Sequence, residues 1–166
     1  MKYYKKIMDG IATVIKILVA LAVSIMLIIS FLEIIRRYCF GHSWAWSDEL
    51  IRYLIVAVAF LGGALAYRAK ALPCFDLIMS KLPIRIQKVL SLIILLITAG
   101  MMVFLIVQTY RSVTAKSILA AVSIGLQIPM VIPYSTIPAG FVLMLLFDVE
   151  NIFDTIQSLR SKEAST

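Results

Sequence analysis

The charged residues of this sequence that could do chemistry gather at the entrance to its second apolar run. Arg36 and Arg37 end the first apolar run. Glu49 and Arg52 open the second run and stand three residues apart, so their side chains share one face of a helix. An arginine of the preceding run could reach them, which predicts an ion-pair cluster between the two helices; alternatively, one charge is left for a partner subunit. Trp46 beside them is typical of a side chain that anchors a helix end at the membrane surface.

Small residues recur in the same apolar run. Ala59 and Gly63 are four residues apart, and so are Gly62 and Ala66. Small side chains at this spacing let the backbone of another helix approach closely. We therefore expect this face to contact protein and not lipid.

The sequence shows no pattern typical of catalysis or of a bound cofactor. Its single histidine, His42, lies between two apolar runs, where it cannot ligate a haem inside a helix bundle. It has no zinc-protease helix, serine elbow, phosphate-binding glycine loop or cluster of metal ligands. The apolar runs also lack the central charged residue that solute pumps usually carry. We predict no catalytic, metal-binding or substrate-binding residue, no cofactor and no enzyme activity.

The composition indicates an integral membrane protein. Of 166 residues, 62% are hydrophobic and 15% charged, and the mean hydropathy is +1.00, outside the range of soluble domains. A spanning helix takes about 20 residues, so four crossings use most of the chain. We predict an all-α fold in a single membrane domain over 1–166, with spans over 11–35, 47–67, 86–110 and 129–147. Amphipathic spacing predicts further short interfacial helices over 2–10, 74–82 and 149–160.

Local signals refine these spans. Ser47 has the chemistry of an N-cap for the second span. Glu33 can pair with Arg36 or Arg37, three and four residues on. Three prolines at the start of the fourth span predict that its first half is irregular or bent: Pro129, Pro133 and Pro138.

The distribution of basic residues predicts the orientation. The net charge is +7, which in a soluble chain could suggest nucleic acid. Here ten basic residues lie in the N-terminal segment, the second loop and the C-terminal segment, against four on the opposite side. Because basic loops stay inside, this bias places both termini in the cytoplasm. We therefore expect membrane lipid around the chain and no nucleic acid partner.

An ordered set of short motifs resembles the small membrane subunit, of the Q or DctQ type, of the tripartite ATP-independent periplasmic (TRAP) transporters. The first motifs are Arg37-Tyr38, Phe40-Gly41, Trp46 with Asp48-Glu49 and Arg52, Phe60-Leu61-Gly62, Arg68 and Asp76. The later ones precede or open the last span: Gln127-Ile128-Pro129-Met130, Ile132-Pro133-Tyr134 and Ile137-Pro138-Ala139-Gly140-Phe141. One departure is Lys70-Ala71-Leu72-Pro73, where family members often carry Gly-His, so a role tied to that histidine does not transfer.

The resemblance implies a complex in the bacterial inner membrane. A large multi-span subunit would hold the substrate and sodium sites, and a periplasmic substrate-binding protein would deliver a carboxylate-type solute. The small subunit would be a non-catalytic scaffold that braces the large one. Its interface or interhelical candidates are Arg36, Arg37, Trp46, Glu49, Arg52, Ala59, Gly62, Gly63, Ala66 and Asp76.

Two other interpretations remain open. A self-contained, homo-oligomeric small exporter of four spans would need a carboxylate inside the membrane. The only candidate glutamates are Glu33 and Glu49, and both stand near span ends. A structural membrane anchor for an unrelated complex would differ only in its partner.

Overall fold

The structure, a computed structural model, describes residues 2–42, 44–69 and 84–163. This part of the chain forms five helices: α1 (Lys2–Phe40), α2 (Ala45–Arg68), α4 (Ile84–Val113), α5 (Lys116–Leu119) and α6 (Val131–Glu163). All except α5 contain a segment long and apolar enough to cross a membrane. The all-α, four-span prediction is confirmed, whereas the orientation of the termini stays a prediction.

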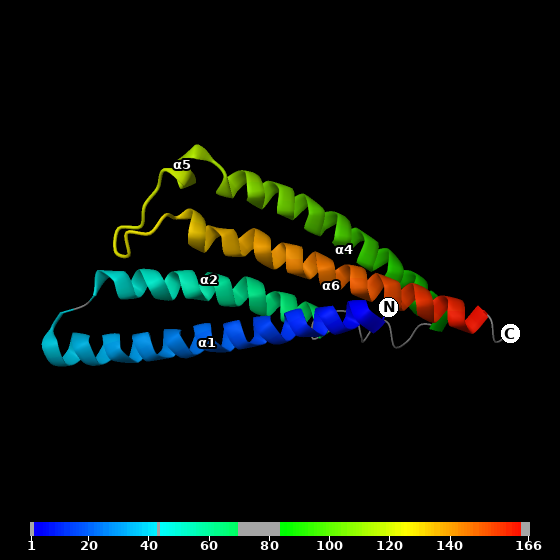
Figure 1. Cartoon of the computed structure of the whole chain (residues 1–166), viewed down its shortest axis with the longest axis horizontal. Helices are drawn as coiled ribbons and strands as arrows, with labels where there is room; N and C mark the ends of the chain where they lie inside the picture. The colour runs from blue at the N-terminus through cyan, green and yellow to red at the C-terminus, as the bar shows by residue number, and fades with distance from the viewer. Residues whose placement is uncertain (1, 43, 70–83, 164–166) are drawn as a thin grey trace.

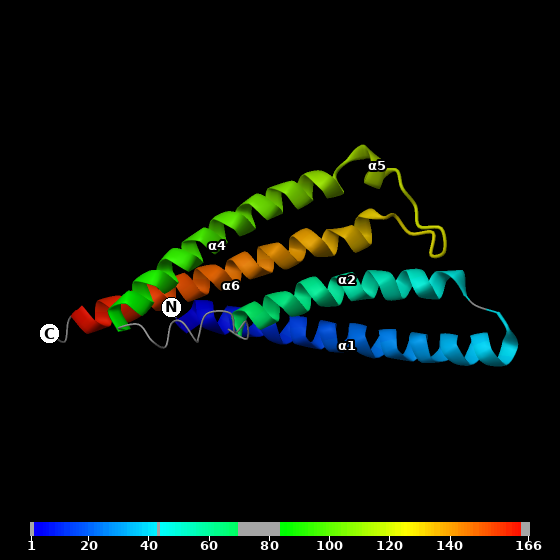
Figure 2. The same cartoon turned by 180° about the vertical axis from the view of Figure 1, so that it is seen from behind.

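The four long helices lie side by side in one row, in the order α1, α2, α6, α4 (Figure 1; Figure 2). Within the described residues, α2 packs on α1 and α6, and α6 packs on α2 and α4. The row is tighter at the end where the termini lie and opens toward the α5 end (Figure 1). The protein is therefore an open layer of helices and not a closed bundle.

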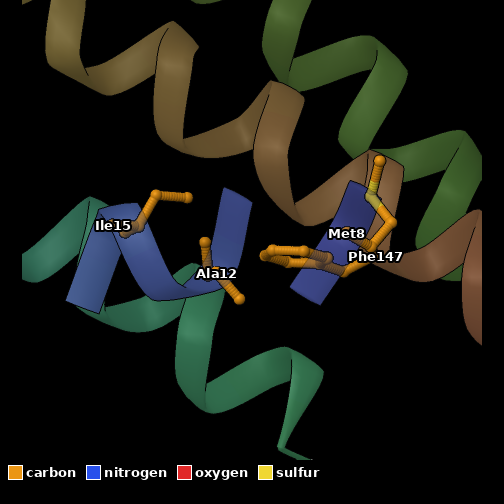
Figure 3. Packing of buried hydrophobic residues seen from close by; sticks show 5 residues of the cluster. Met8, Ala12, Ile15 and Phe147 are labelled. Carbon is orange, nitrogen blue, oxygen red and sulfur yellow. The ribbon is translucent and has the colours of Figure 1, made fainter. Parts of the chain in front are cut away.

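A small apolar core lies at the tight end of the layer. It joins Met8, Ala12 and Ile15 of α1 to Ala64 of α2 and Phe147 of α6. The ring of Phe147 points toward Ala12 (Figure 3). Away from this core, large apolar side chains along α1 and α4 are exposed, as expected of helices that face lipid or a partner subunit.

Glycine permits a close approach between α2 and α6 at Gly140. A Cβ atom at Gly140 would lie 2.7 Å from the Cβ atom of Phe60 and 3.1 Å from its carbonyl oxygen. The Phe60 ring meets the ring of Phe141 edge-on, with the centroids 5.3 Å apart. A side chain at position 140 would therefore push the two helix backbones apart.

The helix ends differ from the sequence prediction. Residues 2–10 form the first turns of α1 and residues 149–160 belong to α6, so the two helices predicted there continue the long helices without a break, and their interfacial position stays a prediction. The core explains the continuity at the first site, because Met8 is buried in it together with residues further along α1. The 39 residues of α1 are about 58 Å long, well beyond the ~30 Å hydrocarbon layer, so its ends project from it. The predicted helix over 74–82 lies outside the described residues.

The starts of α2 and α6 also differ. Trp44, and not Ser47, occupies the N-cap of α2 and makes no side-chain capping bond. The hydroxyl of Ser47, inside the first turn, donates to the Trp44 carbonyl oxygen at 2.8 Å. Of the predicted irregularity or bend in the first half of the fourth span, irregular backbone ends at Met130, because α6 is helical from Val131 and continues through Pro138, whereas a bend stays a prediction. Pro133 stands in the first turn, where backbone N–H groups have no helical acceptor.

Candidate functional site

Polar side chains connect the helices at both ends of the layer. We call the group near the termini the terminal joint; it consists of Asp9, Tyr67, Arg68, Asp148 and Glu150. We call the group at the opposite end the loop joint; it consists of Glu33, Arg36, Trp44, Glu49 and Tyr53 with the backbone of Gly125 and Leu126. These joints are where polar side chains of the described residues connect the helices, and we take them as the candidate functional site.

Arg68, the last residue of α2, is the centre of the terminal joint. Its Nη2 atom lies 2.7 Å from Oδ1 of Asp9 in α1. Its Nε and Nη2 atoms bind both carboxylate oxygens of Glu150 in α6, at 3.1 and 3.2 Å. The Glu150 side chain is 11% exposed and that of Asp9 70%. The planar fork of the guanidinium thus connects three helices, with its stronger pair on the less exposed carboxylate.

A buried tyrosine–aspartate pair lies beside it. The hydroxyl of Tyr67 in α2 donates to Oδ1 of Asp148 in α6. Asp148 is fully buried, and its Oδ2 atom has no hydrogen-bond partner among the described residues. A buried carboxylate in an apolar setting is costly unless it is hydrogen-bonded, so Tyr67 is essential to keeping it there.

Glu49 organises the loop joint. Its Oε1 atom accepts a hydrogen bond from the Tyr53 hydroxyl at 2.7 Å. Its Oε2 atom accepts the backbone N–H groups of Gly125 at 2.8 Å and Leu126 at 3.2 Å. A Cβ atom at Gly125 would lie 2.9 Å from the Ala45 carbonyl oxygen, so the loop packs directly on the first turn of α2. One carboxylate thereby fastens the connection between α5 and α6 to α2.

Glu33 and Arg36 connect the end of α1 to the start of α2. The carboxylate of Glu33, which is 8% exposed, accepts the Trp44 N–H with its two oxygens at 3.2 and 3.4 Å. The guanidinium carbon of Arg36 lies 3.9 Å from the centroid of the Trp44 ring, and that ring stacks on Trp46 at 5.3 Å. These contacts combine a charge-assisted hydrogen bond with a cation–π contact.

The structure separates the residues that the sequence analysis grouped. The predicted ion pair between Glu49 and an arginine is not formed in the described part of the chain, whereas Arg68 forms ion pairs with Asp9 and Glu150. Glu33 likewise binds a backbone N–H in place of Arg36 or Arg37. Arg37 and Arg52 are exposed, and Asp76 lies outside the described residues.

The small residues that were predicted to share one face also lie in different surroundings. A Cβ atom at Gly63 would lie 3.0 Å from Cε of Met144 in α6, so Gly63 faces the interior of the layer. Gly62 meets nothing within 4 Å, Ala59 is exposed and Ala66 is half-buried. Ala64, a small residue of the same stretch that the sequence analysis did not single out, is fully buried.

The sequence analysis also missed the terminal joint except for Arg68, which appeared only as a motif residue and a basic loop residue. The available signal was the position of the acids: Asp9, Asp148 and Glu150 all stand at the ends of apolar runs that meet at the same membrane side as Arg68. Within the described residues, no group of three or more histidines, cysteines or acids could hold a metal ion. In both joints the side chains attach helices or a loop to one another.

Residues 25–158 match the sequence profile of the family described as tripartite ATP-independent periplasmic transporters, DctQ component. The chain is 27% identical over 147 residues to the ectoine TRAP transporter small permease protein TeaB of Halomonas elongata, covering 89% of this chain and 75% of that protein. It is 26% identical over 133 residues to the isethionate TRAP transporter permease protein DctMQ of Oleidesulfovibrio alaskensis. This match covers 76% of this chain but only 21% of that longer relative.

Proposed function

The chain belongs to the DctQ component family of the tripartite ATP-independent periplasmic transporters, and from this premise we propose that it is a non-catalytic scaffold for sodium-driven uptake of a carboxylate-type solute. The family is one of transporter permease subunits, which are not enzymes, in the bacterial inner membrane. DctQ components act with a large DctM component. The relative named DctMQ, of which this chain matches 21%, has the length to carry both components in one chain.

The absence of charge from the middle of the spans supports the scaffold role. The sequence has no charged residue over 17–32, 53–67, 89–110 or 129–147. The charged groups stand at the two ends, where Glu33, Glu49 and Arg68 already hold helices or a loop. An anionic solute that crosses hydrocarbon usually needs a charged partner on its way, and these stretches contain no charged residue. The observation that carries the proposal is this restriction of charge to the ends of the spans.

The solute, the coupling ion and the periplasmic substrate-binding protein are proposals that go further than membership of the family. Ectoine and isethionate, the solutes in the relatives' names, both carry an anionic oxygen group, a carboxylate and a sulfonate respectively. They support a small solute with such a group. Coupling to sodium and delivery by a periplasmic substrate-binding protein complete the proposed system, with substrate and sodium held by the large subunit.

The proposed orientation places the terminal joint at the cytoplasmic side. The excess of basic residues at that end supports it. The loop joint then faces the periplasm, together with the exposed side chains of Arg37 and Arg52. We propose that these two arginines, with the outward face at Ala59 and Gly62, contact the large subunit. The other candidates make contacts within this chain: Arg36, Trp46, Glu49 and Gly63.

The interface part of the proposal is tested by a pair of adjacent substitutions. Gly62→Leu adds bulk where nothing lies within 4 Å, whereas Gly63→Leu adds it against Met144 of α6. We expect Gly62→Leu to reduce co-purification with the large subunit while the chain itself keeps its thermal stability. Gly63→Leu should lower the stability of the chain first. If both variants co-purify at the parental level, the outward face is not the interface.

The scaffold role is tested by reconstitution in liposomes. The chain alone, the large subunit alone and the two together are compared for sodium-driven uptake of ectoine and isethionate with the binding protein present. We expect no flux from the chain alone and the highest flux from the two together. Solute movement by the chain alone would overturn the proposal in favour of the self-contained exporter. The geometry gives that rival little support, because both glutamates it would use are bound to backbone N–H groups.

A further inference from the structure

The loop between α5 and α6, residues 120–130, presents an apolar side chain at its tip. Ile124 is 94% exposed, the largest exposed fraction of any large apolar side chain in the described residues. Val122 in the same loop is also exposed. The sequence has no charged residue over 117–147, so the loop offers no charged side chain to water. The scaffold role proposed above assigns no contact to this tip.

The tip belongs to an ordered turn in which backbone groups are paired. The N–H group of Ser123 donates to the Ile128 carbonyl oxygen at 2.9 Å, and that of Gln127 donates to the Ser123 carbonyl oxygen at 3.1 Å. The two N–H groups that follow Ile124 donate to the carboxylate of Glu49. Unpaired backbone groups are what makes a loop costly away from water. The turn around Ile124 can therefore lie where water is scarce.

The tip also lies at the level where the apolar layer ends. The loop runs from α5 toward the start of α2 (Figure 1). There a Cβ atom at Gly125 would lie 2.9 Å from the Ala45 carbonyl oxygen and 2.9 Å from Cα of Trp46. From Glu49 to Arg68, α2 is about 29 Å long, close to the ~30 Å of the hydrocarbon layer. Tryptophan is typical of the boundary between hydrocarbon and headgroups. The tip therefore stands at this boundary, on the side opposite to the terminal joint.

Lipid is the occupant that these observations favour. Removing the Ile124 side chain from water is favourable, because its surface is apolar. A partner protein recognises a loop through charged groups or free hydrogen-bond donors, and the N–H groups on both sides of Ile124 are already paired. The boundary of the lipid layer needs no such groups. It accepts an apolar side chain that stands on a turn with paired backbone groups.

We propose that the Ile124 side chain inserts into the lipid at this boundary and that the loop is thereby a membrane-surface anchor of the chain. The exposed side chains of Leu119 and Ile132 extend the apolar surface on the two sides of the loop. Because Glu49 fastens the loop to α2, the anchor also fixes the depth of α2 in the membrane. The proposal goes beyond the scaffold role, and it holds for either orientation of the chain.

The test is spin labelling of the full chain in liposomes of phosphatidylethanolamine and phosphatidylglycerol. Cys39 and Cys74 are replaced by serine, and a nitroxide is attached to Ile124→Cys. Relaxation of the label by oxygen, which concentrates in lipid, is compared with relaxation by a water-soluble nickel chelate. Ile97→Cys, at an exposed position in an uncharged stretch of α4, is the lipid reference. His42→Cys, at an exposed polar position between α1 and α2, is the water reference.

We expect the oxygen-to-nickel ratio at position 124 to be severalfold that at position 42 and closer to that at position 97. Adding the large subunit to the liposomes should leave this ratio unchanged. A ratio closer to that at position 42 would overturn the proposal, because the tip would then lie in water. Loss of access for both reagents when the large subunit is added would also overturn it, because protein would then cover the tip. If Ile124→Cys fails to fold, Val122→Cys replaces it, with the same expected and contrary results.

Discussion

The terminal joint and the loop joint hold one layer of helices by different chemistry. At the terminal joint, side chains bind side chains: Arg68 binds two carboxylates, Tyr67 binds Asp148, and an apolar core lies against them. At the loop joint, the carboxylates of Glu33 and Glu49 bind mainly backbone N–H groups. The first joint therefore depends on both partners of each pair. In the second, each carboxylate binds backbone N–H groups, which are present whatever the sequence.

This difference fits the shape of the layer. The helices converge at the end of the layer where the termini lie (Figure 1). There the side chain of Arg68 in α2 contacts Asp9 of α1 and Glu150 of α6. The helices separate toward the loop joint, and there a loop fills the distance and brings its N–H groups to Glu49. We infer that the terminal joint sets the stability of the layer, whereas the loop joint sets the position of the loop.

The largest expected effect is that of Arg68→Ala. It leaves the nearly buried Glu150 without its partner, and breaking such a pair costs about 3 kcal/mol of unfolding free energy. The measurement is denaturant unfolding of the full chain in detergent. Arg111→Ala, at an exposed arginine in the last turn of α4, is the control and should lose less than about 0.5 kcal/mol. Equal losses in the two variants would remove the terminal joint as the stabilising one.

Tyr67→Phe should have the next largest effect. It removes the described hydrogen-bond donor to the buried Asp148, which should cost about 2 kcal/mol. Tyr110→Phe, at an exposed tyrosine of α4, serves as the control. If Tyr67→Phe unfolds like the parent, the Asp148 carboxyl does not need this donor.

Glu49→Gln should act on the loop more than on the whole chain. The amide keeps one acceptor oxygen but loses the charge that binds Gly125 and Leu126, so we expect a loss of stability that is mostly local to the loop. Hydrogen exchange at those two amides should therefore become faster. Asp48→Asn changes the exposed neighbouring acid and should leave the exchange unchanged. Protection that survives Glu49→Gln would show that the loop holds itself in place.

The smallest effect is expected for Tyr53→Phe, the same change as at Tyr67 but in the loop joint. Glu49 keeps its two backbone donors, so the loss should be about 0.5 kcal/mol. The two tyrosine variants compared in one unfolding series sharpen the contrast between the joints. A larger loss for Tyr53→Phe than for Tyr67→Phe would reverse it.

The apolar runs predicted the long helices well, because hydropathy alone marks a membrane-spanning segment. The ends of the helices were harder to predict. Amphipathic spacing at residues 2–10 looks the same in a separate surface helix and in the first turns of a long one, and only the burial of Met8 and Ala12 decides between them. The sequence could not show that α6 continues through Pro138, because a proline that ends a helix and a proline that a helix tolerates look the same in a sequence.

The joints show a second limit of sequence reasoning. Charges of opposite sign near one another suggest ion pairs, and this logic assigned Glu49 to an arginine. A backbone N–H donor leaves no trace in the residue types, so Gly125 and Leu126 could not be foreseen as its partners. The pairing of Arg68 with Asp9 and Glu150 needed the order of helices in the layer, which the sequence does not state.

The most direct test of the scaffold account is to purify the tagged chain from its native membrane in mild detergent and to identify what accompanies it by mass spectrometry. The account predicts one large multi-span membrane protein in about a one-to-one ratio, with the ratio reduced in Gly62→Leu. Recovery of the chain only with copies of itself would contradict the account. It would also return attention to the buried carboxylates Glu33 and Asp148.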